Sequence, residues 1–286
     1  MNLPQPVANF CRNNGYGAIL RVTSLGGGCI NNASRLDTDG GPLFLKVNDS
    51  TPPDMFEREA EGLIALAAPN TIRVPKVLCV GPNFILQEFV EPAKGDHKGR
   101  PYWETLGEQL ARLHLTTSPR FGFPHDNYIG STPQVNTWED DGYTFFAEHR
   151  LRYQANLARR NHRLDSSAHS SLISLVSRIS SLIPPQPASL IHGDLWSGNI
   201  HTGLNGEPVL IDPAAYYGWA EAELAMMTLF GSPPSSFFHT YESVRPLTPG
   251  YRERFDLYNL YHLLNHLNLF GESYGASVRA ILQRYA

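Results

Sequence analysis

Alternating apolar and polar positions mark the first 90 residues of the chain. The pattern predicts five strands, at residues 19–22, 31–36, 43–47, 77–80 and 84–86. The turn between the second and third runs contains Asp39-Gly40-Gly41, which is typical of a β-hairpin. We therefore expect a small antiparallel sheet at the start of the chain.

A helical period interrupts this pattern at residues 55–67. Phe56 and Leu63 lie on the apolar face of that segment. Asp54 precedes it as the expected N-cap, and Pro69 follows its last turn. We therefore expect one helix between the third and fourth strands.

Helical patterns dominate the chain after residue 100. They cover residues 102–115, 145–158, 166–182, 221–230, 252–270 and 274–285. Strand patterns almost disappear until residue 190, and residues 88–100 are rich in Pro, Gly and charge, as in a hinge region. We predict an α+β, bilobal fold with two lobes. The first is a small antiparallel-sheet lobe at residues 1–90 with its hinge at about 87–91. The second is a larger, mainly helical lobe at residues 91–286.

The composition is that of an ordinary globular protein. Of the 286 residues, 42% are hydrophobic and 17% are charged, which excludes a disordered chain. No apolar run approaches the roughly 18 to 20 residues that a membrane span requires, and residues 1–10 do not resemble a signal peptide. The net charge of −4 gives no support to nucleic-acid binding. Cys11, Cys29 and Cys79 are scattered, so we expect a reducing, cytoplasmic location.

The most informative segment is the loop His192-Gly193-Asp194-Leu195-Trp196-Ser197-Gly198-Asn199. It lies between two apolar runs, and the second run ends on Asp212. Protein kinases carry the same order, H-R-D-L-x-x-x-N and then D-F-G. By this pattern we predict Asp194 as the catalytic base and Asn199 and Asp212 as oxygen ligands of Mg²⁺, with His192 as a brace. The alternative is two unrelated turns, since Asp, Asn and Gly favour turns.

Lys46 lies on the third predicted strand, within Phe44-Leu45-Lys46-Val47. A Lys flanked by apolar residues is unfavourable unless its charge is used. A kinase site would use it to bind the nucleotide phosphates and would pair it with a Glu on the following helix. We predict Glu59 for this pair, because it borders the apolar face of that helix. The alternative is a Lys at a solvated sheet edge beside an ordinary charged helix.

A glycine-rich stretch, Gly26-Gly27-Gly28-Cys29-Ile30-Asn31, separates the first two predicted strands. Glycines there let backbone amides approach phosphate oxygens, so we predict that Gly27, Gly28 and Cys29 contact the nucleotide. A hairpin turn without a ligand is the alternative. A redox-sensitive Cys29 thiol is a further hypothesis.

Aromatic and polar residues near the loop are candidates for the acceptor site. Trp196 follows the catalytic segment, where an aromatic ring can stack on a sugar, although Trp is more often part of a core. A long polar loop that we expect to form or brace the acceptor pocket contains His125, Asp126 and Asn127. A plain surface loop is the alternative. His266 and Asn268 either face the pocket or are buried and hydrogen-bonded.

With these motifs the chain resembles the fructosamine-kinase family, also called ketosamine-3-kinases. That family belongs with the aminoglycoside phosphotransferase and choline kinase relatives of protein kinases. The resemblance rests on the glycine-rich stretch, the Lys46 strand, the Glu59 helix and the catalytic loop, and on residues 106–114, 121–134 and 260–271. One departure is Trp219-Ala220, where members often carry His-Arg, and it bears on acceptor preference.

The resemblance implies a protein-kinase-like fold, ATP and Mg²⁺ as cofactors, and transfer of the γ-phosphate to the 3-hydroxyl of a ketosamine. Ketosamines form when sugars react with amines, and the phosphorylated product releases the free amine, which implies deglycation repair. For adenine, the resemblance implies backbone hydrogen bonds from Glu88, Phe89 and Val90. It leaves open whether the acceptor is a small-molecule ketosamine or a glycated protein side chain, and whether the protein is a monomer or a homodimer.

Two other functions are open from the sequence. A kinase of another small hydroxyl compound, such as an aminoglycoside or choline, would share the catalytic loop. An aminoglycoside would favour an acidic pocket, whereas the last helices contain Arg252, Arg254, Arg279 and Arg284. A nucleotide-binding pseudokinase would bind ATP without turnover, which the joint presence of Lys46 and the loop residues argues against.

Overall fold

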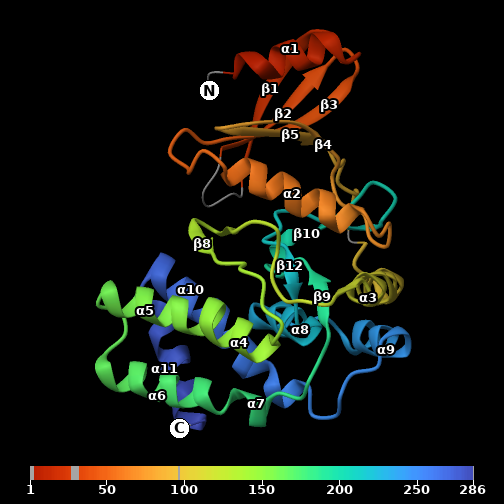
Figure 1. The fold of residues 1–286 in the computed structure, drawn as a ribbon. Helices are drawn as coiled ribbons and strands as arrows, with labels where there is room; N and C mark the ends of the chain where they lie inside the picture. The colour runs from red at the N-terminus through yellow and green to blue at the C-terminus, as the bar shows by residue number, and fades with distance from the viewer. Residues whose placement is uncertain (1–2, 27–31, 96, 286) are drawn as a thin grey trace.

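A five-stranded antiparallel sheet forms the small N-terminal part of the protein (Figure 1). The computed structural model describes residues 3–26, 32–95 and 97–285. In the sheet order β1-β2-β3-β5-β4, the strands are β1 (Ile19–Leu25), β2 (Asn32–Thr38), β3 (Gly41–Val47), β5 (Phe84–Glu88) and β4 (Val77–Gly81). Lys46 of β3 is paired with Ala33 on one side and Ile85 on the other. Lys46 therefore lies on a central strand, which rules out the solvated-edge alternative.

Two helices flank this sheet. Helix α1 (Gln5–Asn13) places Val7 and Cys11 in a small core against the sheet. Helix α2 (Met55–Ala67) lies between the sheet and the larger part (Figure 1), and its Phe56 and Leu63 belong to the core of that larger part. The sequence predicted α2 at these bounds but missed α1, which is short, follows Pro4 and contains Pro6 in its first turn.

The larger part is mostly helical, as predicted. Its helices are α3 (Arg100–His114), α4 (Gly142–Phe146), α5 (Tyr153–Arg160), α6 (Ser166–Ser177), α7 (Ile179–Leu182), α8 (Ala220–Leu229), α9 (Ser235–Val244), α10 (Phe255–Phe270) and α11 (Gly275–Arg284). Helix α9 was not predicted. It packs closely on α3 at Gly107, where an added Cβ would lie 2.5 Å from the Phe237 carbonyl oxygen.

Short strands position the catalytic segments. They are β6 (Thr117–Ser118), β7 (Asn127–Ile129), β8 (Thr132–Gln134), β9 (Ala188–Ile191), β10 (Ile200–Thr202), β11 (Pro208–Leu210) and β12 (Tyr216–Gly218). Strands β6, β7 and β8 were missed because two or three residues are too few to show a period. Strand β9 lies between β12 and β6, and β10 pairs with β11. The loop after β9 and the segment after β11 are thereby brought together.

The helix predicted at residues 145–158 contains a π-helical segment, η1 (Ala147–Arg152), between α4 and α5. Arg150 in this segment is fully buried, and its guanidinium lies 4.0 Å from the centre of the Tyr216 ring. It donates hydrogen bonds to the Val135 carbonyl (2.5 Å) and to Asn136 Oδ1 (2.8 Å). Aromatic faces and carbonyl oxygens thus surround this buried cation.

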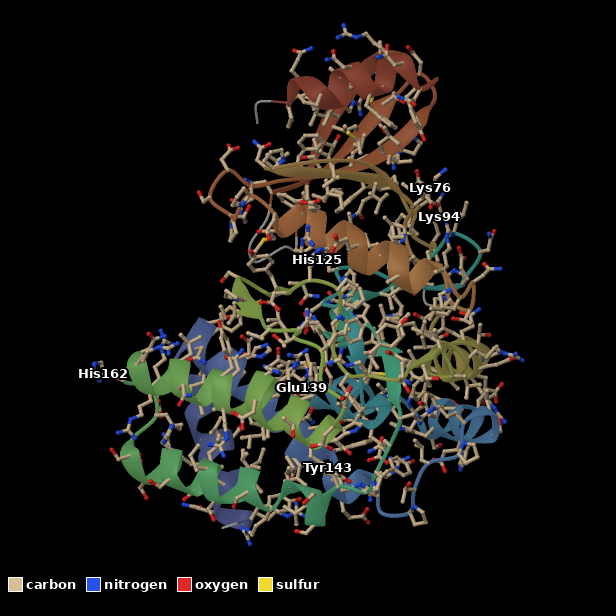
Figure 2. The ribbon with its side chains drawn as sticks, in the orientation of Figure 1. Lys76, Lys94, His125, Glu139, Tyr143 and His162 are labelled. Carbon is tan, nitrogen blue, oxygen red and sulfur yellow. The ribbon has the colours of Figure 1, made fainter. Side chains whose placement is uncertain are left out.

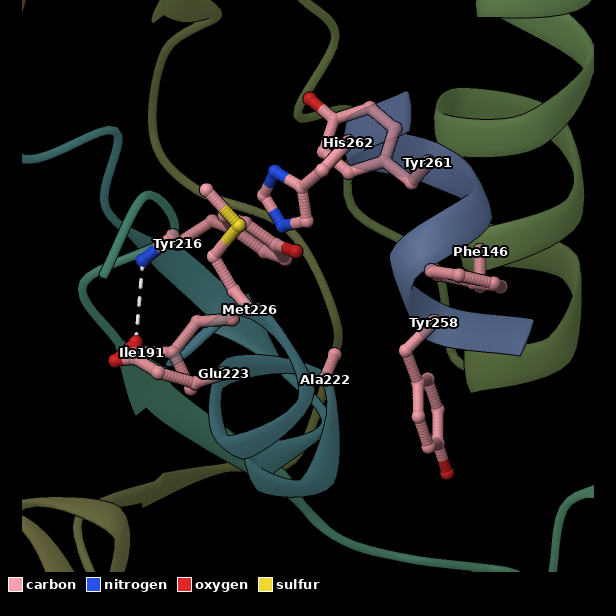
Figure 3. Close-up of a pocket in the computed structure, with 10 residues that line it drawn as sticks. Phe146, Ile191, Tyr216, Ala222, Glu223, Met226, Tyr258, Tyr261 and His262 are labelled. Carbon is pink, nitrogen blue, oxygen red and sulfur yellow. Dashed lines mark hydrogen bonds between the residues drawn. The ribbon is translucent and has the colours of Figure 1, made fainter. Parts of the chain in front are cut away.

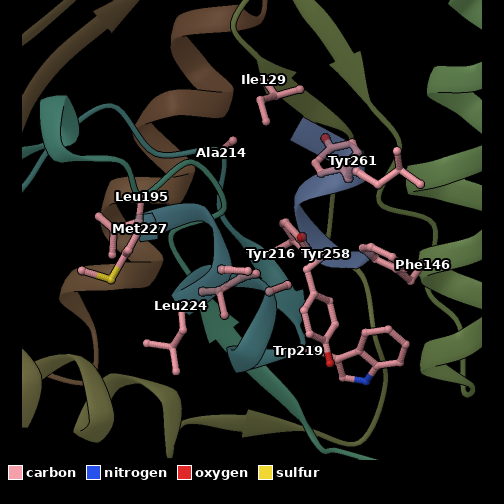
Figure 4. Packing of buried hydrophobic residues seen from close by; sticks show 14 of the residues in the cluster. Ile129, Phe146, Leu195, Ala214, Tyr216, Trp219, Leu224, Met227, Tyr258 and Tyr261 are labelled. Atoms are coloured by element: carbon pink, nitrogen blue, oxygen red, sulfur yellow. The ribbon is translucent and has the colours of Figure 1, made fainter. Parts of the chain in front are cut away.

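Aromatic rings fill the core beneath the catalytic loop (Figure 4). Trp219 is buried, with its ring centre 5.4 Å from that of Phe146 and 6.0 Å from that of Tyr258. The position at which the chain departs from the family pattern is therefore part of the core, and no charge is needed there.

The predicted division at residues 90 and 91 stays a prediction, although the sheet ends at Glu88 and the next helix begins at Arg100. Among the residues that the structure describes, no helix is both long and apolar enough to cross a membrane.

Candidate active site

The catalytic loop begins directly after β9 with His192, Gly193 and Asp194. Gly193 has φ of +83°, and an added Cβ would lie 2.1 Å from the Ala214 carbonyl oxygen. Any other residue would be strained and would collide with backbone. The chain therefore requires Gly where protein kinases carry Arg, because the segment after Asp212 passes directly beside the loop.

The buried carboxylate of Glu223, which the sequence did not predict, holds this loop in place. Glu223 of α8 accepts hydrogen bonds from the backbone amides of His192 (2.6 and 2.8 Å) and Gly193 (3.2 Å). It is 2% exposed, and its Oε1 lies 3.5 Å from Nε2 of the buried His114. The available signal was a Glu among apolar residues at the start of a helix, which is unfavourable when buried unless it is hydrogen-bonded.

His192 is a brace, as predicted. Its Nε2 is hydrogen-bonded to the Ile211 carbonyl (2.8 Å), and its Nδ1 accepts a hydrogen bond from the Asp194 amide (3.3 Å). Because a carbonyl can only accept, Nε2 carries the proton. Burial lowers the pKa of His192, which keeps the ring neutral and joins the loop to the segment before Asp212.

Asp194 and Asn199 lie next to each other in the loop. The Asn199 side-chain amide donates to the Asp194 carbonyl (2.8 Å) and to its carboxylate (3.3 Å), so its remaining side-chain atom for a ligand is Oδ1. Burial, and then repulsion from Asp212, raise the pKa of Asp194 to about 8. Asp194 is therefore more basic than an ordinary carboxylate.

Lys46 connects the small part to Asp212. Its Nζ donates to Glu59 of α2 (2.8 Å) and to Asp212 (2.5 Å), so the predicted pair with Glu59 is present. Burial alone would lower the pKa of Lys46, but the two carboxylates outweigh it and raise the pKa. Gln87 on β5, which the sequence did not predict, donates to Glu59 (2.9 Å) and fixes its position.

Asp212 has an uncommon backbone conformation, with φ of +57°. Left-handed conformations of residues other than Gly are strained, and such strain is found most often at functional sites. His192 accepts a backbone bond from Ala214 (2.9 Å) and thereby helps to hold the segment in place. The strained turn aims the Asp212 carboxylate toward Lys46.

The predicted adenine segment, Glu88 to Val90, follows β5. The Glu88 amide already donates to the Lys76 carbonyl (2.8 Å), so this amide is not available to a nucleotide. The Glu88 carboxylate binds Arg73, which also binds Glu207 of the turn between β10 and β11. The Arg35 guanidinium lies 4.6 Å from the centre of the Phe89 ring, and the His201 ring is hydrogen-bonded to the Val90 backbone.

The predicted acceptor loop at residues 125–127 braces the protein. His125 lies beneath α2 (Figure 2), with Nδ1 3.1 Å from Glu61. Asp126 accepts a hydrogen bond from the Asn136 amide (2.7 Å). Asn127 is buried and donates to the Ala215 carbonyl (2.9 Å), close to the Asp212 segment. Of the two roles predicted for this loop, the contacts favour bracing.

Trp196 lies at the surface, with 39% of its area exposed, two residues after Asp194. Asn268 is buried and donates to Gln154 Oε1 (2.8 Å), whereas His266 is half-buried among aromatic rings. Of these three candidates, Trp196 is exposed, His266 is partly exposed, and Asn268 is buried. Gly27, Gly28 and Cys29 lie outside the described residues.

The residues behind the loop leave no room for an acceptor. Tyr216, Glu223, Tyr261 and His262 line a hollow there (Figure 3) that is too narrow to admit a water molecule. Burial lowers the pKa of His262 to about 3, so its ring is neutral. This side of the loop is therefore filled by the core of the protein.

The donor set suits a divalent cation held jointly with phosphates. In the described part of the chain, no group of three or more His, Cys, Asp or Glu forms a complete metal site. Mg²⁺ is usually held by one or two carboxylates plus nucleotide phosphates, which fits Asp212 and the Asn199 oxygen. Repulsion between Asp194 and Asp212 is the kind of interaction that a cation relieves.

Comparison with known proteins gives consistent results. A model of the fructosamine kinase family matches residues 8–286. A probable ketoamine kinase of Synechocystis sp. is 44% identical over 269 residues, which cover 91% of this chain and 88% of that protein. A chloroplastic protein-ribulosamine 3-kinase of Arabidopsis thaliana is 44% identical over 277 residues, 93% of this chain and 83% of that one.

Solved structures agree with the fold. A candidate fructosamine-3-kinase from Thermobifida fusca superposes with a TM-score of 0.88 and 31% identity, covering 99% of this chain and all of that one (100%). An aminoglycoside phosphotransferase superposes with a TM-score of 0.64 at 16% identity, which shows the fold alone. The predicted α+β kinase-like fold and the predicted family are thus confirmed. The chain belongs to the fructosamine kinase family.

Proposed function

We propose that the protein is an ATP-dependent kinase that phosphorylates the 3-hydroxyl of ketosamines. The observation that carries this proposal is that Lys46, Asp212 and Asp194 lie close together, within a chain of this family. A structural neighbour, an aminoglycoside phosphotransferase, has been solved with AMP-PNP and hygromycin B, which supports a nucleotide as the phosphate donor. Release of the amine from the product would make the reaction a deglycation repair step.

Each residue has a defined part in the proposed reaction. Lys46, held by Glu59, would bind nucleotide phosphates, and the backbone from Glu88 to Val90 would contact adenine. Asn199 and Asp212 would hold Mg²⁺, which neutralises phosphate charge when bound. The acceptor oxygen forms a bond to the γ-phosphorus as the bond to the leaving ADP oxygen breaks. The hydroxyl proton passes to the Asp194 carboxylate.

A substrate panel tests the proposal. ATP consumption is measured with ribulose-lysine, fructose-lysine, kanamycin and choline. We expect turnover with one or both ketosamines and none with the other two. Turnover with only kanamycin or choline would overturn the proposed acceptor, and tight ATP binding without any turnover would favour a pseudokinase.

The Asp194→Asn variant tests the base. It should bind Mg-ATP nearly as wild type and lose about 100-fold or more in kcat, since a positioned base contributes about 10²–10⁴-fold. Activity within about threefold of wild type would remove Asp194 from the role of base.

We also propose a reducing, cytoplasmic location. Cys11 and Cys79 are free thiols that lie in the same small core, without a disulfide between them. Chemical labelling of thiols in intact cells, followed by mass spectrometry, tests this; a Cys11–Cys79 disulfide in cells would contradict it.

A further inference from the structure

Three aromatic side chains are exposed on the larger part of the protein. Trp196, Phe230 and Phe270 expose 39%, 41% and 53% of their surface. Among residues 3–26, 32–95 and 97–285, every other Phe, Trp or Tyr is buried or half-buried. Contiguous apolar surface with a polar rim commonly marks a place where another molecule binds.

These rings form one continuous row. The centre of Trp196 lies 6.2 Å from that of Phe230, which lies 5.1 Å from the ring of His266. His266 in turn lies 5.4 Å from Phe270 and 5.0 Å from Tyr274. We call these five residues the aromatic strip. Segments far apart in sequence, namely the catalytic loop and the ends of α8 and α10, contribute to it.

The inner end of the strip belongs to the catalytic loop. The Trp196 amide donates to the Asp194 carbonyl (3.1 Å). The Trp196 ring lies against Gly198, where an added Cβ would come within 2.3 Å of it. An acceptor with its hydroxyl at Asp194 therefore lies beside the start of the strip.

Glu272, which lies between Phe270 and Tyr274 in the sequence, lines an arginine-rich hollow of about 590 Å³. The residues that line it include Arg159, His162, Arg163, Glu272 and Arg279, and His162 lies at the tip of α5 in Figure 2. Glu272 is paired with Arg279 (2.5 Å), and Asp165 caps α6 by accepting from the Ala168 amide (2.8 Å). With three arginines against two carboxylates in its lining, the hollow carries a net positive charge and favours an acidic group.

The length of the strip indicates the kind of molecule it fits. Three ring-to-ring steps of 6.2, 5.1 and 5.4 Å separate Trp196 from Phe270. An extended polypeptide advances about 3.3 Å per residue, so the strip spans at most about five residues. The adduct of a single amino acid would cover only its inner end.

We propose that the aromatic strip binds the polypeptide segment next to the modified side chain, so that flanking residues determine which ketosamines are phosphorylated. An apolar or aromatic neighbour would pack on Phe230 and Phe270, and an acidic residue beyond it would reach the arginine-rich hollow. This inference rests on the proposed ketosamine kinase function and adds selection by sequence context.

Three substrates carrying the same ribulose-lysine test the inference. One is the free adduct, one is a peptide with glycines on both sides, and one is a peptide with Phe and then Glu on both sides. We expect kcat/KM for the Phe-Glu peptide to exceed that for the glycine peptide about tenfold, mainly through KM, because a packed ring contributes that much binding.

Alanine variants show whether the aromatic strip is responsible for the peptide preference. Phe230→Ala and Phe270→Ala should each lower the ratio of kcat/KM for the Phe-Glu peptide over the glycine peptide about five- to tenfold. Leu115→Ala is the control, because Leu115 is 56% exposed but lies outside the strip, at the C-cap of α3. Its ratio should equal that of wild type, and thermal unfolding checks that each variant is folded.

The outcomes separate the two proposals. Turnover of the free adduct with equal kcat/KM for both peptides would overturn the inference and leave the ketosamine kinase function standing. A peptide preference that survives in both Phe variants would also overturn it. Failure of all three substrates would instead reject the proposed function, and the inference with it.

Discussion

Single backbone positions decide the shape of the catalytic loop. Gly193 and Asp212 both adopt positive φ, +83° and +57°, on two segments that contact each other. At Gly193 the absence of a Cβ lets Ala214 approach, whereas at Asp212 the strain is tolerated because neighbouring bonds hold the segment. Both segments therefore have backbone conformations close to the steric limit, and they carry the carboxylates of Asp194 and Asp212.

The pKa of Asp194 leads to a prediction for stability. Its pKa of about 8 in the folded protein lies above the ordinary 3.8, so the neutral form stabilises the fold and this contribution is lost as pH rises from about 4 to 8. Without Mg²⁺, the Tm of wild type should fall relative to that of Asp194→Asn between pH 5 and pH 9. Excess Mg-ATP should reduce the difference, because a cation favours the carboxylate.

Thermal unfolding across this pH range, with and without Mg-ATP, measures the effect. Parallel curves of Tm against pH for wild type and Asp194→Asn would contradict the prediction. They would show that burial and Asp212 do not destabilise the ionised Asp194 carboxylate.

Glu223 leads to a second prediction at the residue scale. In Glu223→Gln, one side-chain oxygen is replaced by NH₂, which cannot accept the loop amides, so the loop should shift and kcat should fall about tenfold or more. The matched control is Glu221→Gln, on the same helix and equally buried but bound to Arg254 (2.7 Å) and Tyr258 (2.9 Å). The control should lose stability while retaining most of its kcat. Steady-state kinetics and Tm of both variants test this, and equal losses of kcat would make Glu223 a purely structural residue.

At the scale of elements, the segment at residues 121–136 acts as a strap on α2. The Tyr128 hydroxyl donates to Asp54 (2.7 Å), and His125 contacts Glu61, so the start and the middle of α2 are held. Asp54 is the N-cap residue of α2, but its side chain makes no capping bond and accepts from Tyr128 instead. Because α2 carries Glu59, the strap helps to fix the Lys46 pair.

Removal of one strap contact should loosen α2. Tyr128→Phe should lower the free energy of unfolding by about 0.5–1.5 kcal/mol, the usual contribution of one hydrogen bond, and should raise KM for ATP. Tyr285→Phe is the control. The Tyr285 hydroxyl donates to the Glu253 carbonyl (3.0 Å), and Tyr285 is the C-cap residue of the last helix, α11, far from α2 in the sequence. Urea unfolding and ATP kinetics of both variants test this; a similar KM in the two would argue against a role for the strap in nucleotide binding.

At the scale of the whole molecule, Arg73 joins the two parts of the protein. Its guanidinium binds Glu88 at the end of the sheet and Glu207 in the hairpin β10–β11, and its carbonyl accepts from the Leu210 amide (2.9 Å). This clamp crosses beside the predicted hinge and limits the angle between the two parts. Its side chain is 38% exposed, so water and salt weaken it.

The ion pairs of Arg73 should contribute modestly to stability and more to the relative position of the two parts. Arg73→Ala should lower Tm by about 2–4 °C, for a loss of about 1 kcal/mol, and should raise KM for ATP. Arg100→Ala, which removes an exposed pair with Glu104 (2.7 Å) within α3, should change neither. Differential scanning calorimetry and kinetics at low and high salt test the clamp, and identical behaviour of the two variants would contradict it.

Local patterns in the sequence determined most of the architecture. Period-two runs predicted the five strands of the sheet and a 3.6-residue period predicted α2, because burial of one face imposes a period on each element. The order Asp194, Asn199, Asp212 predicted the catalytic segment, since that chemistry needs fixed residue types on neighbouring strand ends. The family and the kinase-like fold followed from these motifs and are confirmed.

Only the tertiary structure decided how distant residues act together. Glu223 and Gly193 meet across 30 positions in the sequence. Trp196 lies beside Phe230, which lies beside His266, although no period in the sequence links these residues. Likewise the sequence predicted that His125 and Asn127 form or brace the acceptor pocket, and only the structure shows that they contact α2 and the segment after Asp212. The physical reason is that a side chain's partners depend on packing between elements, whereas the sequence pattern records only which face of each element is buried.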